Sequence, residues 1–250
     1  VSRPGKTGKF VNLEATSTRN DKSGLSASFS QAVRMLTLLT PTAESPPALI
    51  INGCITQASN STSIRPINSD TDTAGESVRL TGTQPCPPFP AIDLHQGSIT
   101  THRLRRRLWS TVFTVSIEEF TKRAEAEQAL PGAEQRYWIV HPTDLINGRW
   151  TQSLGSPTHP IVLYFPPNVA CPEFSPGTSI YGIVFIDSSC PAPIASVRFE
   201  IFGSLVINGD LNASGADIHL NHIQFADDSL TLLNFPVLRS VKVPGSWRDF

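Results

Sequence analysis

A short apolar motif recurs along the chain and limits the folds that the chain can adopt. Segment 205–210 (LVINGD) repeats segment 49–54 (LIINGC) almost letter for letter, and segment 182–187 (GIVFID) is similar to both. A further apolar run lies at 161–165 (IVLYF). Each β-branched run that ends in Asn-Gly or Asp-Ser is typical of a strand followed by a turn. The sequence therefore predicts several short, similar strands.

The spacing of these strands suggests that they stack. Val162, Val184 and Val206 are twenty-two residues apart each time. One strand in each repeat of about 20 residues is typical of a solenoid, in which each turn covers the next. A β-sandwich with similar strands is the alternative. The predicted fold class is mainly β with two short helices, as a solenoid-like or stacked-sheet domain.

The composition agrees with a turn-rich β protein. The 250 residues include 21 Pro and 16 Gly, and only 16% are charged. The net charge of −1 gives no global attraction to nucleic acid or to an anionic membrane. No apolar run reaches the about 20 residues that span a bilayer. The chain begins at Val1, so we expect a processed or truncated form.

Four cysteines indicate an exported protein. Cys54, Cys86, Cys171 and Cys190 form no C-x-x-C pair, which disfavours zinc and thioredoxin-like sites. Pairing of neighbours, Cys54 with Cys86 and Cys171 with Cys190, would close two moderate loops in Pro/Ser/Thr-rich sequence. We expect these two disulfides and an oxidising compartment, the alternative being four buried thiols in a cytosolic protein.

Three regions follow from the pattern along the chain. Residues 1–25 are polar and predict an extended lead, residues 26–150 a helix and a β region with an inserted helix, and residues 151–250 the repeats. Apolar positions between Phe29 and Leu39 follow helical spacing, which predicts a helix over 26–39. A capping box at Ser116 predicts a second helix that ends near 130. Alternating or β-branched runs predict strands at 48–55, 77–81, 137–140 and 237–243.

Several of these segments together resemble the minor pilin-like proteins of type IV pili (PilX-type prepilin family). The resemblance rests on segment 48–55, on 108–113 followed by 116–119, on the glycine-containing repeat 182–211, and on the closing segment 245–250. It covers most of residues 26–250. The apolar, methylated N-terminal helix of that family is absent, so this helix would have been removed, with 26–39 as its remaining end.

The resemblance implies a non-enzymatic structural and interaction protein of a pilus. Such a protein takes part in pilus assembly, adhesion or DNA uptake. Its partners would be other pilins, with DNA or surface glycans as ligands, and it would contact the membrane only through the missing helix. It would be extracellular on the pilus, and periplasmic before assembly. No cofactor is expected.

A basic cluster is the candidate ligand-binding site. Arg103, Arg105, Arg106 and Arg107 precede Trp109. Arginines could bind DNA phosphates, and the indole could stack on a base. The alternative is a solvated edge that prevents strand pairing with neighbouring molecules.

Two groups of metal-ligand residues are weak candidates. On a strand, Asp217 and His219 share a face but His222 does not, so they fit one metal ion poorly. An acidic loop could hold calcium but lacks the glycine and final glutamate of an EF-hand, and a solvated loop is the alternative. That loop carries Asn68, Asp70, Asp72 and Glu76. No metal site is expected.

A carbohydrate-binding or carbohydrate-active β-helix is the alternative function. Asp187 and Asp210 follow similar strands and could stack as a glycosidase carboxylate pair, although aspartate is also common in turns. Because no nucleophile, zinc-protease or phosphate-loop motif is present, we expect no enzyme. A glycan groove would be lined by aromatic residues. The candidates are Tyr164, Phe165, Tyr181, Phe185 and Phe202.

Overall fold

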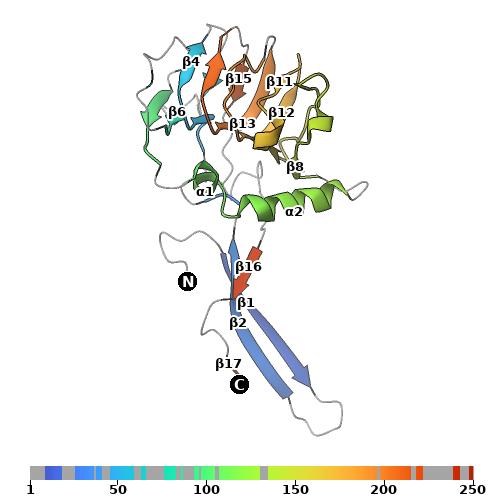
Figure 1. Ribbon diagram of the computed structural model, residues 1–250. Coiled ribbons are helices and arrows are strands. Elements are labelled where there is room, and N and C mark those ends of the chain that lie inside the picture. The colour runs from blue at the N-terminus through green and yellow to red at the C-terminus, as the bar shows by residue number, and fades with distance from the viewer. Residues whose placement is uncertain are drawn as a thin grey trace.

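The fold is mainly β and contains a large parallel sheet, as Figure 1 shows. The computed structural model describes residues 9–18, 26–36, 38–40, 46–58, 63–65, 76–82, 86, 93–95, 97–104, 107–129, 135–195, 198–214, 218–221, 239–242 and 248–249. A head of stacked strands lies above the two helices, and a long antiparallel hairpin projects on the other side (Figure 1).

The strands form one large sheet, two small pairs and the projecting sheet. Among the described residues, the large sheet has nine strands: β3 (Leu49–Ile51), β5 (Ser63–Arg65), β6 (Glu76–Leu80), β7 (Ser98–Thr101), β8 (Tyr137–Ile139), β10 (Ile161–Phe165), β12 (Ser179–Ile186), β13 (Phe199–Ile207) and β15 (Ile218–Asn221). The small pairs are β4 (Ile55–Ala58) with β14 (Leu211–Ala213), and β9 (Arg149–Trp150) with β11 (Glu173–Phe174). The projecting sheet contains β1 (Lys9–Thr18), β2 (Ser26–Leu36), β16 (Arg239–Lys242) and β17 (Arg248–Asp249).

Two helices connect the edge strands β7 and β8 of the large sheet, and short 3-10 turns follow β8 and β10. They are α1 (Leu108–Val112), α2 (Ile117–Gln128) and the 3-10 turns η2 (Pro142–Asp144) and η3 (Pro167–Val169). Within the residues that the structure describes, no helix is long and apolar enough to cross a membrane.

The first strand of the large sheet in chain order, β3, lies in the middle of the sheet. The strand order is β7-β6-β3-β13-β12-β10-β8, so the chain winds from β3 to one edge, crosses through α1 and α2, and winds back from the other edge. This path places β13 against β3, with Leu205 opposite Leu49 and Ile207 opposite Ile51. The two most similar sequence segments are therefore neighbours in register. The large sheet therefore contains strands from both of the predicted regions 26–150 and 151–250.

The register of the repeated strands differs by one residue from the predicted spacing. Gly182 pairs with Ile161 and with Gly203, which is an offset of 21 residues rather than 22. Val184 accordingly pairs with Leu163 and Leu205, not with the other two valines. A shift of one residue moves a side chain to the opposite face. The predicted valine row is therefore wrong, although all three valines belong to one sheet.

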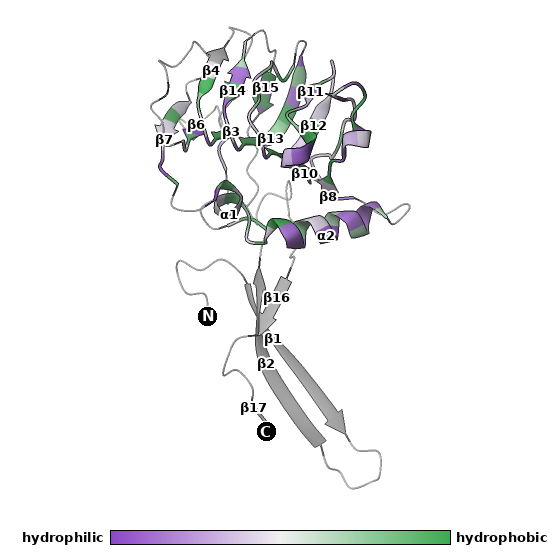
Figure 2. Cartoon of the chain, viewed as in Figure 1, coloured by the Kyte–Doolittle hydropathy of each residue, from purple (hydrophilic) through white to green (hydrophobic). Residues whose placement is uncertain are grey.

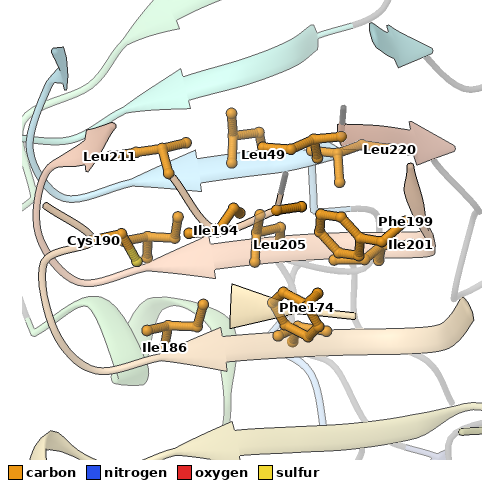
Figure 3. Packing of buried hydrophobic residues seen from close by; sticks show 14 of the residues in the cluster. Leu49, Phe174, Ile186, Cys190, Ile194, Phe199, Ile201, Leu205, Leu211 and Leu220 are labelled. Carbon is orange, nitrogen blue, oxygen red and sulfur yellow. The ribbon is translucent and has the colours of Figure 1, made fainter. Parts of the chain in front are cut away.

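The two faces of the large sheet carry separate cores. One face packs inside the head, where Figure 3 shows Leu49 beside Leu205, Ile186 on the next strand, and the rings of Phe174 and Phe199 in the same cluster. The other face packs against the helices through a second cluster. That cluster includes Ile50, Val162, Tyr164, Ile183, Phe185 and Val206, with Leu108, Trp109, Val112 and Phe120 from the helices. Because both faces are covered at the centre of the sheet, β3 and β10 are apolar throughout, and β12 and β13 end in the mostly apolar runs GIVFI and GSLVI.

Both predicted disulfides are present. Cys54 bonds Cys86 and Cys171 bonds Cys190, across sequence separations of 32 and 19 residues. The first bridge closes a long segment whose described residues include the short strands β4, β5 and β6, as predicted. The second bridge joins the turn after β12 to the segment after η3.

One prediction for the N-terminal region is wrong. Residues 26–36 form the strand β2 instead of a helix, and residues 9–18 of the expected lead form the strand β1. The two strands pair antiparallel from Lys9 opposite Met35 to Thr18 opposite Ser26. The sequence SASFSQAVRML also alternates with a period of two, so the local pattern fits either structure. A ten-residue ladder with β1 favours the strand.

The second predicted helix is confirmed. α2 begins after Ser116, whose side chain accepts a hydrogen bond from the Glu119 amide at 3.1 Å. Phe120 and Ala124 are its buried residues, and the rest of α2 is mostly hydrophilic in Figure 2. The short helix α1 was not predicted, because its sequence reads equally as a β-branched and aromatic run.

Candidate ligand-binding cavity

A row of hydrogen-bonded polar side chains crosses the ends of five neighbouring strands. Asn208 Nδ2 donates to Asp187 Oδ1 at 2.6 Å, and Asn52 Nδ2 donates to Asn208 Oδ1 at 2.7 Å. Thr81 Oγ1 extends the row to Asn52 Oδ1 at 3.4 Å, and Tyr164 Oη donates to Asp187 Oδ2 at 3.0 Å from the other side. We refer to these five residues as the polar ladder.

The sheet register aligns the ladder. Asp187, Asn208, Asn52 and Thr81 each follow the last residue of β12, β13, β3 and β6. Backbone hydrogen bonds continue the sheet through these positions. The backbone N–H groups of Asn208, Asn52 and Thr81 each donate, at 2.8 Å, to the carbonyl of the last residue of the neighbouring strand. Neighbouring strands lie about 4.8 Å apart, so the side chains are spaced to reach each other.

A cavity of ≈ 480 Å³ lies over the ladder. Asp187, Asn208, Asn52 and Thr81 form its polar side. The exposed Arg107 also lines it. The apolar walls come from Leu104, Leu108, Trp109, Ile117 and Phe185. A concave site with apolar walls and a few convergent polar groups is the usual form of a small-ligand site.

The ladder leaves donors and acceptors for a ligand. An asparagine amide has two N–H donors, and Asn52 and Asn208 each use one along the ladder. The Asp187 carboxylate accepts one ladder hydrogen bond on each oxygen and retains further acceptor capacity. Burial, followed by the nearby Asp187 charge, raises the pKa of Tyr164, so its hydroxyl stays protonated as a donor. The cavity therefore offers amide donors beside a carboxylate acceptor.

The expected stacked pair of Asp187 and Asp210 does not form. With the 21-residue register, the position equivalent to Asp187 on the next strand is Asn208. Asp210 lies in the following turn, where its Oδ1 accepts a hydrogen bond from the Cys54 amide at 2.7 Å. Asp187 lines the cavity and Asp210 does not. Asp187 is therefore a residue of the cavity, whereas Asp210 binds the backbone at Cys54.

The basic cluster is only partly described. Arg103 and Arg107 are exposed, whereas Arg105 and Arg106 lie outside the described residues. Trp109 is 5% exposed, and its Nε1 donates to the Val115 carbonyl at 2.7 Å. The Trp109 ring also packs on other aromatic rings, among them Phe113 and Phe185. It offers no open face to a base, and DNA binding by the arginines stays a prediction.

The candidate metal residues are not brought together in the described parts of the chain. Asp217, His222, Asn68, Asp70 and Asp72 lie outside those parts. Glu76 is occupied by hydrogen bonds from Arg79 and Thr100. Burial alone would raise the Glu76 pKa, but these hydrogen bonds outweigh it and lower that pKa. No group of three possible ligands occurs among the described residues.

A Ser-His-Asp cluster that the sequence did not reveal lies elsewhere on the sheet. His95 Nε2 is 2.8 Å from Ser63 Oγ and 3.2 Å from Asp93 Oδ2. In a catalytic triad the carboxylate holds Nδ1 while Nε2 faces the serine. Here both partners meet the same nitrogen, so the cluster lacks the geometry of a nucleophilic site.

The predicted aromatic groove is not formed. Tyr164, Phe165 and Phe185 are each at most 2% exposed and belong to the two cores. Tyr181 and Phe202 are half-buried and stack on each other, with their ring centroids 4.4 Å apart. The sequence does not predict the cavity over the polar ladder, because Asn-Gly is a common turn sequence and the alignment of the asparagines depends on the strand register.

Searches against protein-family models, curated proteins and solved structures find no match for this chain.

Proposed function

We propose that this chain is an exported, non-enzymatic carbohydrate-binding scaffold. Its head is a β-solenoid-like stack, and its ligand site is the cavity over the polar ladder. The proposal unites the solenoid expected from the repeats with the alternative function expected from the sequence.

The strand register supports the solenoid. β10, β12 and β13 are parallel and offset by 21 residues, and each is followed by a turn or a short segment away from the large sheet. After β13 the chain forms β14, which pairs with β4, and returns as β15 beside β13. A strand that leaves the sheet and returns next to itself is one turn of a solenoid.

The single observation that carries the carbohydrate proposal is the polar ladder beside an apolar wall. A sugar ring presents hydroxyl groups, which both donate and accept, and C–H patches, which are apolar. The asparagine amides and the Asp187 carboxylate match the hydroxyl groups. Leu104 and Ile117, which are half-buried, belong to the wall that would face the C–H patches. Arg107 adds a donor at the same cavity.

One carboxylate among the described residues that line the cavity supports binding without cleavage. A glycosidase needs two carboxyl groups flanking one bond, about 5 to 10 Å apart. Asp187 is the carboxylate of this cavity, among the residues that the structure describes, and both its oxygens accept hydrogen bonds. The two disulfides fit an oxidising compartment outside the cytosol.

Membership of a type IV pilus stays a prediction from the sequence. The strand β2 stands where the pilin helix was expected, so that resemblance lacks its main structural feature. Copurification of the chain with pilus filaments would test it.

A glycan array followed by calorimetry tests the proposal. We expect the parent protein to bind a set of glycans that it does not hydrolyse. Asp187→Asn should weaken binding by about tenfold, because a charged hydrogen-bond acceptor is lost. Asp210→Asn is the matched control, since Asp210 lies outside the cavity, and should bind as the parent does. Absence of glycan binding, or equal loss in both variants, would contradict the proposal.

A further inference from the structure

A second cavity lies between α2 and the edge of the large sheet. It measures ≈ 280 Å³. Val115, Phe120 and Tyr137 form its floor, with exposures of 8%, 2% and 0%. Lys122 and Arg123 also line it, and both are exposed. The cavity thus joins a buried apolar floor to a charged rim.

The floor contains a polar group without a partner. Tyr137 Oη is buried and has no hydrogen-bond partner among the described residues. A buried hydroxyl without a partner is destabilising, so such groups in native proteins usually meet a water or a ligand. Burial raises the pKa of Tyr137, which keeps the hydroxyl protonated and able to donate. An acceptor atom in the cavity would satisfy it.

The rim supplies positive charge beside that hydroxyl. The Arg123 guanidinium lies over the Tyr137 ring, with Cζ 5.0 Å from the ring centroid. Its Nε is 3.4 Å from Glu127, which leaves the terminal nitrogens for a ligand. Lys122 pairs with Glu118 at 2.8 Å, but both side chains are largely exposed, so this pair is weak. Among the described residues that line the cavity, Glu119 is the one carboxylate, beside Lys122 and Arg123.

We propose that this cavity binds a small carboxylic acid with an apolar body, such as an aromatic or short acyl acid. The apolar body fills the floor against Val115 and Phe120. The carboxylate accepts hydrogen bonds from Tyr137 Oη and from Arg123. A planar guanidinium binds a carboxylate with two parallel hydrogen bonds, which selects acids over neutral compounds. This site is independent of the carbohydrate cavity, and either can fail without the other.

Calorimetric titration with benzoate and hexanoate tests the proposal, with benzyl alcohol and hexanol as neutral controls. We expect saturable binding of at least one acid, with Kd of about 10 mM or tighter. Binding of the matched alcohol should be at least about tenfold weaker, because it lacks the charge-assisted hydrogen bonds. Failure of both acids to bind, or equal binding of acids and alcohols, would overturn the proposal.

Two substitutions locate the site. Arg123→Gln keeps much of the side-chain stem and should weaken acid binding by about tenfold or more. Tyr137→Phe keeps the ring and should weaken it by roughly threefold to tenfold. Arg149→Gln is the control, since Arg149 pairs with Glu173 at another part of the surface. Acid binding that is unchanged in the first two variants would place the ligand elsewhere and overturn the assignment. Loss with Arg149→Gln would do the same.

Discussion

Replacement of Gly182 by alanine tests the stacking of the repeated strands. Gly182 lies in β12 with φ of +137°, and Gly203 lies opposite it with φ of +144°. A Cβ atom on Gly182 would lie 1.9 Å from the Ile161 carbonyl oxygen and 2.7 Å from the Ile161 nitrogen. The neighbouring strand β10 therefore occupies the space that any side chain would need.

The expected cost has two parts. A non-glycine residue at positive φ costs about 1 to 3 kcal/mol. The contact with Ile161 is with backbone, so β10 must move, and overpacking of this kind costs about 1 to 3 kcal/mol more. The free energy of unfolding should thus fall by about 2 to 6 kcal/mol. For a chain of this size that corresponds to a decrease in Tm of about 4 to 24 °C.

Gly177→Ala is the matched control. Gly177 precedes the same strand with φ of +74°, but a Cβ there would meet no atom within 4 Å. It should lose only the conformational part, about 1 to 2 kcal/mol. Urea unfolding, followed by tryptophan fluorescence and circular dichroism, measures both variants. Equal losses in the two variants would show that β10 does not lie against Gly182, and would refute the strand register.

Three further outcomes are expected. Reduction of both disulfides, which close sequence separations of 32 and 19 residues, should destabilise the fold by about 3 to 4 kcal/mol each in the loop-entropy model; a thiol assay of the denatured, unreduced protein should find no free thiol. Ser116→Ala should cost about 1 kcal/mol in urea unfolding, because the Glu119 amide loses its cap, whereas Ser110→Ala at an exposed site should cost less. Burial raises the pKa values of Tyr137 and Tyr164 above the unfolded value near 10. Their contribution to stability is therefore present below about pH 10 and lost as the pH rises further, and melting curves from pH 8 to pH 12 should show this loss.

The sequence predicted the local elements best. The Ser116 capping box defined α2, and alternation or β-branching located β6 and β8. The disulfide pairs were predicted from loop length and from the Pro/Ser/Thr-rich sequence that each loop contains. These features depend on neighbouring residues and on simple chain statistics, so they can be read without knowledge of the tertiary structure.

The sequence pattern does not determine the exact register between the repeated strands. Valine was used to align the repeats, yet Val184 aligns with Leu163 and Leu205, because apolar residues substitute for one another within a strand. The close contact at Gly182 and Gly203 fixes the offset at 21 residues, and it becomes visible only once the strands are adjacent.

The candidate site could be predicted only in part. The sequence predicts Asp187 as a site residue, but it pairs Asp187 with Asp210, whereas the structure pairs it with Asn208. The error follows from the register, since a shift along the turn changes which side chain lies beside the carboxylate. Helix prediction over 26–39 failed for a related reason: the pairing of β2 with β1 depends on residues that local periodicity does not include.

Nuclear magnetic resonance of the asparagine side chains tests the central claim most directly. The NH₂ signals of Asn52 and Asn208 can be assigned by substitution and followed while a glycan from the array is added. The carbohydrate proposal predicts that both signals shift with the same saturable dependence on glycan concentration, because both amides line the cavity. Unchanged Asn52 and Asn208 signals at a glycan concentration that saturates binding would contradict it.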